Sequence, residues 1–339
     1  MSIVKSFSLF SGLTAASCCF ALACSAGGGD GGSNDPIVID ESGVHTQFVI
    51  NELIIPKTAN EAKNYEMDLD GDGATENALG GLLAALIKTA NLDLQSGVDD
   101  QLADASFILL ASIKATDLVN ANGVGTYVFF GDNPSPAACT DVQDPQTCGK
   151  HLGGTGAFDI SATSPTDSII AGTLAGGDLS TEAGTISIQL PLADVALQLD
   201  LIAAHIEATV SATGITSAKL GGAITSDDVD NKLIPAVQLL ITDIIAKDCV
   251  PTEVSCGCGA GTAGESVLSF FDSDEDCEVP MMELMSNSLI EATLRNPDLD
   301  LLDEAGNYNP NSDNIPDSLS LAIGFAAVGG TFDLSLIHI

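Results

Sequence analysis

The chain has 339 residues, of which 47 are acidic and 10 are basic, so its formal net charge is −37. Nucleic-acid binding and attachment to an anionic membrane through a polybasic patch both need clustered positive charge, so this composition excludes both. Apolar residues make up 45% of the chain, which is enough for a sizeable core in one large domain or two ordinary ones.

The first 23 residues have the composition of an export signal. Lys5 is followed by apolar and small residues up to Ala23, a run that is too short and too often interrupted by Ser and Thr to span a membrane. The run ends in Ala21-Leu22-Ala23-Cys24, which resembles the lipobox of bacterial lipoproteins. The resemblance implies a signal peptide at residues 1–23 and a lipid on Cys24. An ordinary secretory signal is the alternative.

A tether rich in Gly and Ser follows the predicted lipidation site. Residues 25–36 read SAGGGDGGSNDP, a flexible composition, and we expect the tether to extend to residue 44. Residues 45–333 would then form a single domain, because no similar linker divides them. The resemblance to lipoproteins implies a place in the cell envelope, at the periplasmic or surface face of the outer membrane. The membrane would be a partner through the N-terminal lipid.

The most specific motif lies at residues 68–79, which read DLDGDGATENAL, after a strand predicted at residues 47–55. Carboxylates alternate with other residues at Asp68, Asp70 and Asp72, and Gly73 allows a sharp turn. Oxygen ligands at the first, third and fifth positions of a tight loop can converge on a hard cation such as Ca²⁺. Ala74 would add its backbone carbonyl, and Glu76 would bind directly or through water.

This loop resembles the calcium loop of EF-hands and the aspartate loops of dockerins and thrombospondin type 3 repeats. The resemblance implies a bound Ca²⁺. EF-hands place a bidentate glutamate at position 12, where this chain has Leu79, so the looser aspartate loops or a ligand from elsewhere in the chain are favoured. A solvated acidic turn is the alternative, since D-G-D-G is a turn signal by itself.

A second stretch repeats this spacing near the end of the chain. Four residues are separated as Asp68, Asp70, Asp72 and Glu76 are: Asn309, Asn311, Asp313 and Asp317. Because asparagine carries no charge, we expect a weaker calcium site here, and a plain loop rich in Asn and Pro is the alternative. Acidic residues just upstream could lend ligands to either loop: Asp298, Asp300, Asp303 and Glu304. We also expect the two loops to lie near each other.

The rest of the chain predicts strands followed by helices. Short strands fit residues 106–116, 126–130, 157–161, 169–174 and 319–325. Three alternating runs between residues 185 and 223 argue for an antiparallel meander with one buried face. Helices are expected at residues 78–89, 228–247 and 280–295, the second kinked or beginning at Pro235. The predicted fold class is α+β, an antiparallel β meander packed with a few helices and bonded by disulfides.

The nine cysteines fit an exported protein. Removal of a signal peptide that contains Cys18 and Cys19, and lipidation of Cys24, would leave an even set of six: Cys139, Cys148, Cys249, Cys256, Cys258 and Cys277. The first two of these would pair across a short loop. Cys256 and Cys258 would each take Cys249 or Cys277, in an order that the sequence leaves open. A zinc site of the last four cysteines is the alternative.

Catalytic motifs are absent, since the sequence contains no H-E-x-x-H, G-x-S-x-G or G-x-x-x-x-G-K-[ST]. His205 and Glu207 share one face of a predicted strand, and a solvated polar face explains them. We therefore expect a membrane-anchored, calcium-binding lipoprotein that is not an enzyme and has a binding or structural role. A carrier for an apolar ligand such as lipid is one alternative. A calcium-dependent hydrolase is another, and it would need His151 or His205 beside an acidic cluster.

The sequence of the last six residues looks artificial. Residues 334–339 (LSLIHI) resemble the in-frame translation of a transposon-type sequencing adapter. We expect them to carry no information about the fold. A natural C-terminal strand is the alternative.

Overall fold

A computed structural model describes residues 36–90, 92–139, 148–192, 195–252 and 255–336. The unit that carries all the elements below begins at Ile37, whose backbone N–H donates to Glu182. The predicted signal peptide at residues 1–23 and the predicted lipidation site at Cys24 lie outside the described residues. Within those residues, no helix is both long enough and apolar enough to cross a membrane.

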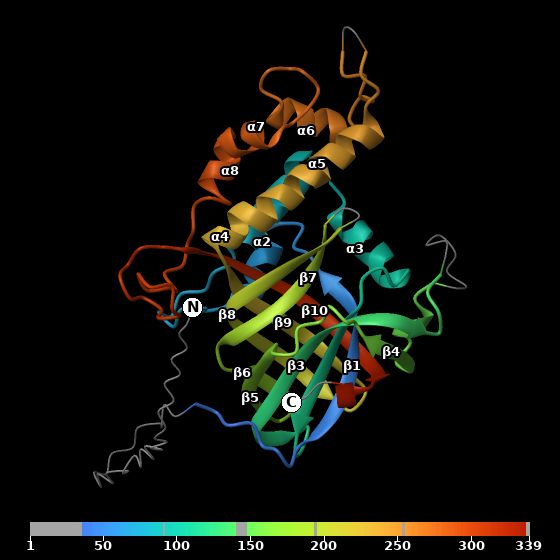
Figure 1. Cartoon of the computed structure of the whole chain (residues 1–339), viewed down its shortest axis with the longest axis vertical. Helices are drawn as coiled ribbons and strands as arrows, with labels where there is room; N and C mark the ends of the chain where they lie inside the picture. The colour runs from blue at the N-terminus through green and yellow to red at the C-terminus, as the bar shows by residue number, and fades with distance from the viewer. Residues whose placement is uncertain (1–35, 91, 140–147, 193–194, 253–254, 337–339) are drawn as a thin grey trace, which may run out of the picture. The chain divides into compact units, whose positions relative to one another are not determined.

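Eight strands close into an antiparallel barrel (Figure 1). In order around the barrel they are β1 (Val44–Ile54), β2 (Leu109–Ala115), β3 (Asn120–Ser135), β5 (Ile169–Ala175), β6 (Asp178–Thr181), β8 (Val195–Ser211), β9 (Gly214–Thr225) and β10 (Ser318–Phe332). β10 returns to pair with β1, with Phe48 opposite Gly329 and Ile54 opposite Gly324. This last pairing closes the sheet, so each of the eight strands has a partner on both sides.

Two further strands extend the barrel. β4 (Gly156–Ile160) pairs antiparallel with β3 and parallel with β10, and β7 (Gly184–Leu192) pairs antiparallel with β8. The meander predicted between residues 185 and 223 is therefore present as β7, β8 and β9, joined in antiparallel pairs. The α+β class and the antiparallel sheet are confirmed, but the sheet closes on itself instead of forming an open meander.

Apolar side chains fill the inside of the barrel. Residues from β1, β2, β3, β6, β7, β8, β9 and β10 surround the space at its centre, among them Ile50, Ile113, Leu179, Ile206, Leu220 and Phe325. The cavity that remains between them measures about 40 Å³. An eight-stranded barrel is just wide enough for its own side chains to fill it, which explains this packed interior.

Helices gather at one end of the barrel (Figure 1). The helical elements are α1 (Ala59–Tyr65), α2 (Ala78–Ala90), α3 (Leu94–Ala103), α4 (Ser226–Asp228), the π-helical turn η2 (Val229–Leu233), α5 (Ile234–Asp248), α6 (Ala263–Phe271), α7 (Met281–Ser286) and α8 (Ser288–Ala292), with single 3₁₀ turns η1 (Lys150–Leu152) and η3 (Leu334–Leu336). α2 and α5 pack over the end of β10 through leucines such as Leu82, Leu240 and Leu321, around a space of about 50 Å³.

Several element boundaries differ from the sequence prediction. The helix expected at residues 228–247, kinked or beginning at Pro235, is present as α4, the π-helical turn η2 and α5, with Pro235 in the first turn of α5. The helix predicted at residues 280–295 is two helices, since Asn287 breaks it and caps α8 by accepting the N–H of Leu289. The predicted strand at residues 126–130 is the middle of β3, which begins at Asn120 and passes Gly123 with a bulge.

All six cysteines of the predicted domain form disulfides. Cys139 bonds to Cys148, Cys249 to Cys258, and Cys256 to Cys277. The structure thereby selects one of the two arrangements that the sequence allowed for the last four cysteines, and their bonding in pairs is incompatible with a four-thiolate zinc site. Disulfides persist in oxidising compartments, so these three bonds suggest an extracytoplasmic location.

Candidate metal centre

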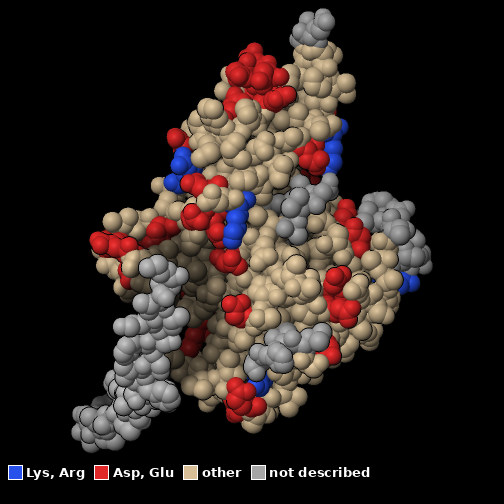
Figure 2. Space-filling view, in the orientation of Figure 1, with Lys and Arg blue, Asp and Glu red and all other residues tan. Residues whose placement is uncertain are grey.

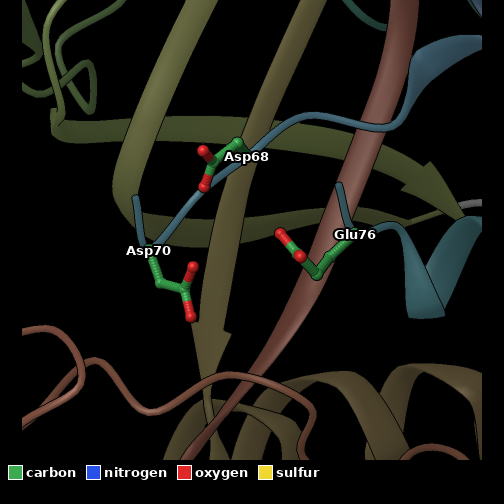
Figure 3. Close-up of side chains that lie close together, drawn as sticks. All are labelled: Asp68, Asp70 and Glu76. Carbon is green, nitrogen blue, oxygen red and sulfur yellow. The ribbon is translucent and has the colours of Figure 1, made fainter. Parts of the chain in front are cut away.

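The loop of residues 68–76 connects α1 to α2 and brings three carboxylates together. Asp68, Asp70 and Glu76 each offer an oxygen that lies within 4.8 Å of the others. Figure 3 shows these side chains around one space, with the first two on the outgoing limb of the loop and Glu76 on the returning limb. Met67 and Glu76 pair through their backbones at the base of the loop. The arrangement could hold a metal ion.

Hydrogen bonds within the loop fix the direction of its carboxylates. Asp68 accepts the N–H of Gly71 at 2.7 Å and that of Gly73 at 3.1 Å. Asp72 turns back to accept the N–H of Ala74 at 2.7 Å and is not part of the triad. Gly71 and Gly73 have φ values of 80° and 89°, a left-handed conformation that glycine adopts without strain.

Two apolar residues next to the aspartates anchor the loop to the outside of the barrel. Met67 and Leu69 are buried in a small cluster whose other buried members are Ala203, Ala223, Leu299 and Leu301. A Cβ atom on Gly221 of β9 would lie 2.8 Å from Sδ of Met67, so this glycine provides the room for the contact. Because Leu69 points into the protein, Asp68 and Asp70 on either side of it point away.

Asn77 fixes the returning limb of the loop. It is buried, and its amide nitrogen donates to the carbonyls of Ala62 and Ala322 at 3.1 and 2.8 Å. Its amide oxygen accepts the N–H of Ala322 at 2.8 Å and that of Gly80 at 3.0 Å, so it also caps α2. Glu76 directly precedes this residue, and the position of its carboxylate is therefore tied to β10.

The electrostatics of the triad disfavour three free charges. Burial raises the pKa of Glu76 to about 7, and the charges of Asp70, Asp72 and Asp68 add to this effect against the lowering influence of the Leu69 N–H. A cation between the carboxylates would favour their charged forms. Calcium, which takes about six to eight oxygens in irregular geometry, suits such a set better than an ion that prefers nitrogen or sulfur.

The second predicted loop lies against the first. The side-chain amide of Asn311 donates to the backbone carbonyl of Asp70 at 3.1 Å, so the two loops are neighbours as expected. Asp317 accepts the N–H groups of Leu301 and Leu302, and Asp313 accepts the N–H of Ile315 at 2.9 Å. These two carboxylates are therefore engaged in holding the loop itself, and within the described part of the chain the Asn309 side chain makes no hydrogen bond.

Asp300 contributes to this second loop from upstream. One of its oxygens accepts the N–H groups of Asp313 and Asn314, at 3.2 and 2.6 Å. The residue is 6% exposed, and its other oxygen, Oδ1, is buried without a hydrogen-bond partner among the described residues. Asp298 instead binds Ser320 of β10 at 2.8 Å. The carboxylates of Asp298 and Asp300 thus accept hydrogen bonds from nearby backbone N–H groups.

A second triad was not anticipated from the sequence. Asp272, Asp274 and Asp276, between α6 and α7, each place an oxygen within 4.8 Å of the others. Figure 2 shows acidic side chains gathered at the outer end of the helical layer, where Figure 1 places the α6–α7 connection. The alternation Asp-x-Asp-x-Asp is a signal for this triad in the sequence. No glycine accompanies it, and the adjacent residue is Cys277, for which the sequence predicts a disulfide.

His151 and His205 lie apart from both triads. His151 is buried, with Nε2 3.1 Å from the carbonyl of Leu102, and burial lowers its pKa despite that contact. Nδ1 of His205 lies 3.2 Å from the carbonyl of Thr181. Neither histidine belongs to an acidic group of the described residues.

Comparison with other proteins adds no further constraint on the site. No protein-family model, curated protein or solved structure matches this chain.

Proposed function

We propose that the chain is an exported lipoprotein of the cell envelope, anchored by a lipid on Cys24, that binds structural Ca²⁺ in the loop of residues 68–76. In this proposal its role is non-catalytic, either binding or structural. One observation carries the metal assignment: Asp68, Asp70 and Glu76 converge on one space outside the barrel. The lipobox-like residues at 21–24 and the three disulfides support export.

A structural ion fits the position of this loop. The loop connects α1 to α2 and contacts the 299–311 segment through Leu69 and through the hydrogen bond from Asn311. An ion held by both limbs of the loop would therefore stabilise the junction between the helices, the barrel wall and the C-terminal loop. Extracellular calcium modules bind with a Kd of roughly 0.1–1 mM, and tenfold excess of free calcium over Kd stabilises a fold by about 1.4 kcal/mol.

The two alternative functions have less support. Sites for small apolar ligands usually measure about 300–1,000 Å³. The cavity at the centre of the barrel is about 40 Å³ and the space under α2 and α5 about 50 Å³, which favours a packed core over a lipid carrier. A hydrolase would need a histidine beside an acidic cluster, and His151 and His205 instead contact backbone carbonyls.

Thermal unfolding of the full, oxidised chain in calcium and in chelator tests the proposal. We expect millimolar calcium to raise the Tm by roughly 2–4 °C, and Asp70→Asn to reduce this rise by the share that the 68–76 loop contributes. The substitution keeps an oxygen that can accept the N–H of Asp72 but removes a charge. Asp167→Asn, at an exposed aspartate far along the chain, removes the same charge and should leave the rise intact. Equal rises in both variants would refute the proposal.

A further inference from the structure

The connection between α6 and α7 has the layout of a complete calcium loop. α6 ends at Phe271, and carboxylates follow at the first, third and fifth positions of the loop: Asp272, Asp274 and Asp276. Counting onward, Glu278 occupies position 7 and Glu283, within α7, occupies position 12. In helix–loop–helix calcium sites these positions supply three side chains, a backbone carbonyl and a bidentate glutamate.

The backbone of this loop follows that of residues 68–76. The carboxylate at position 1 accepts the N–H of position 6 in both, from Gly73 to Asp68 and from Cys277 to Asp272, at 3.1 and 2.9 Å. Positions 4 and 6 are left-handed in both loops, and Glu275 and Cys277 have φ values of 61° and 72°. Cys277 thus occupies the place of the usual glycine and is held there by its bond to Cys256.

Glu283 gives an independent indication that this loop binds a ligand. Its Oε1 accepts from Ser273 and from the N–H of Asp274, which places the carboxylate against the loop. Its Oε2 is fully buried and has no hydrogen-bond partner among the described residues. A carboxylate oxygen buried without a partner is unfavourable, and it calls for a bound group. Asp274, whose N–H donates to Oε1 of Glu283, belongs to the aspartate triad, so a cation is the group that suits this position.

We propose that residues 272–283 form a second calcium site, with Glu283 as the ligand that closes it. One oxygen from each aspartate, the carbonyl of Glu278 and both oxygens of Glu283 reach the lower limit of the six to eight oxygens that calcium takes. The set contains no nitrogen or free thiolate, because Cys277 is bonded to Cys256, so zinc is disfavoured. The site does not depend on the proposed function of the 68–76 loop.

Such a site would organise the helical layer. It would join the end of α6 to the first turn of α7, and Val279 inside the loop is already buried in the core. The Cys256–Cys277 bond links the loop to the segment after α5, which a second disulfide, Cys249–Cys258, ties to the end of α5. Calcium here would therefore stabilise α5, α6 and α7 as one layer.

Calcium titration by calorimetry, on the full oxidised chain, tests the proposal. Glu283→Gln keeps the size of the side chain and its contact with Ser273 but removes the charge, so we expect a loss of roughly tenfold or more in affinity at one site. The matched control is Glu275→Gln, which removes an exposed charge from the same loop outside the ligand set. We expect a change of less than about threefold for this control, since exposed charges are screened. Equal binding by the two variants would overturn the proposal.

Two further variants keep the outcome decisive. Asp274→Asn changes an exposed ligand that also suffers from partial desolvation and from the charges of Asp276, Glu283 and Asp272, which raise its pKa. It should fold even if Glu283→Gln does not, and it should weaken the same site. Asp70→Asn separates the two loops. If it abolishes all binding, the 272–283 site is refuted and the first loop stands; if only Glu283→Gln lowers affinity, the reverse holds.

Discussion

The loops of residues 68–76 and 272–283 share a local turn and differ in which carboxylate lies at its end. In residues 68–76 the third carboxylate is Glu76, on the returning limb of the loop itself, and Asn77 ties that limb to β10. In residues 272–283 the closing carboxylate is Glu283, inside the following helix. Asp-x-Asp-x-Asp is common to both turns, while the surrounding fold determines which later carboxylate would complete a metal site.

Leu79 stands in the first loop at the position that Glu283 has in the second. Of the changes considered, its replacement should have the largest effect on the free energy of unfolding. Leu79 is 2% exposed and packs in the main core. Leu79→Glu would bury a carboxylate without a partner and should lower the free energy of unfolding by more than about 4 kcal/mol, as measured in urea. Leu79→Met should lower it by less than about 1.5 kcal/mol. A well-folded Leu79→Glu variant with tighter calcium binding would show that the two loops are interchangeable.

Asn77 should have the next largest effect. Asn77→Ala removes the hydrogen bonds to Ala62, Gly80 and Ala322 and leaves buried backbone groups without partners. We expect the free energy of unfolding to fall by about 3–5 kcal/mol and calcium affinity to fall at the first loop only. Asn122→Ala, at an exposed position of β3, is the control and should change stability by less than about 0.5 kcal/mol. A similar loss of affinity at residues 272–283 would contradict the assignment of Asn77 to one loop.

The smallest expected effect is a pH dependence of stability that comes from Glu76 in the first loop. The pKa of Glu76 is raised from 4.5 to about 7 in the folded protein, so the folded state holds this proton more tightly than the unfolded chain. Its contribution to stability is therefore complete below about pH 4.5 and is lost as the pH rises through 7. The difference in free energy of unfolding between the wild type and Glu76→Gln, measured without calcium, should change across that window. A difference that stays constant from pH 4 to 8 would contradict the raised pKa.

The first loop could be predicted from the sequence because its signal is local. Alternating aspartates, Gly73 and Glu76 lie within a few residues, and the turn that they specify forms from their own hydrogen bonds. The second loop carries the same aspartates, but Cys277 replaces the glycine and adopts its left-handed conformation within a disulfide. The second loop therefore lacks the glycine signal of the first, and the sequence pattern that marks it is Asp-x-Asp-x-Asp followed by Glu283.

In the fold, too, local features could be predicted from the sequence and long-range contacts could not. Alternation of apolar residues predicted the β7–β9 strands, because each strand shows its buried face within its own sequence. Closure of the barrel depends on β1 meeting β10 and β3 meeting β5, and the register of both pairs shifts at bulges. The function of Asn77 depends likewise on the backbone of Ala322, far along the chain. No short pattern carries such information.

A crystal structure of the oxidised chain, from crystals grown in millimolar calcium, would be the sharpest test of calcium binding at residues 68–76. Anomalous scattering would identify the ion, and refinement would give its ligands. We predict a calcium ion about 2.3–2.6 Å from oxygens of Asp68, Asp70 and Glu76. A well-ordered loop at residues 68–76 with only water between these carboxylates would contradict it.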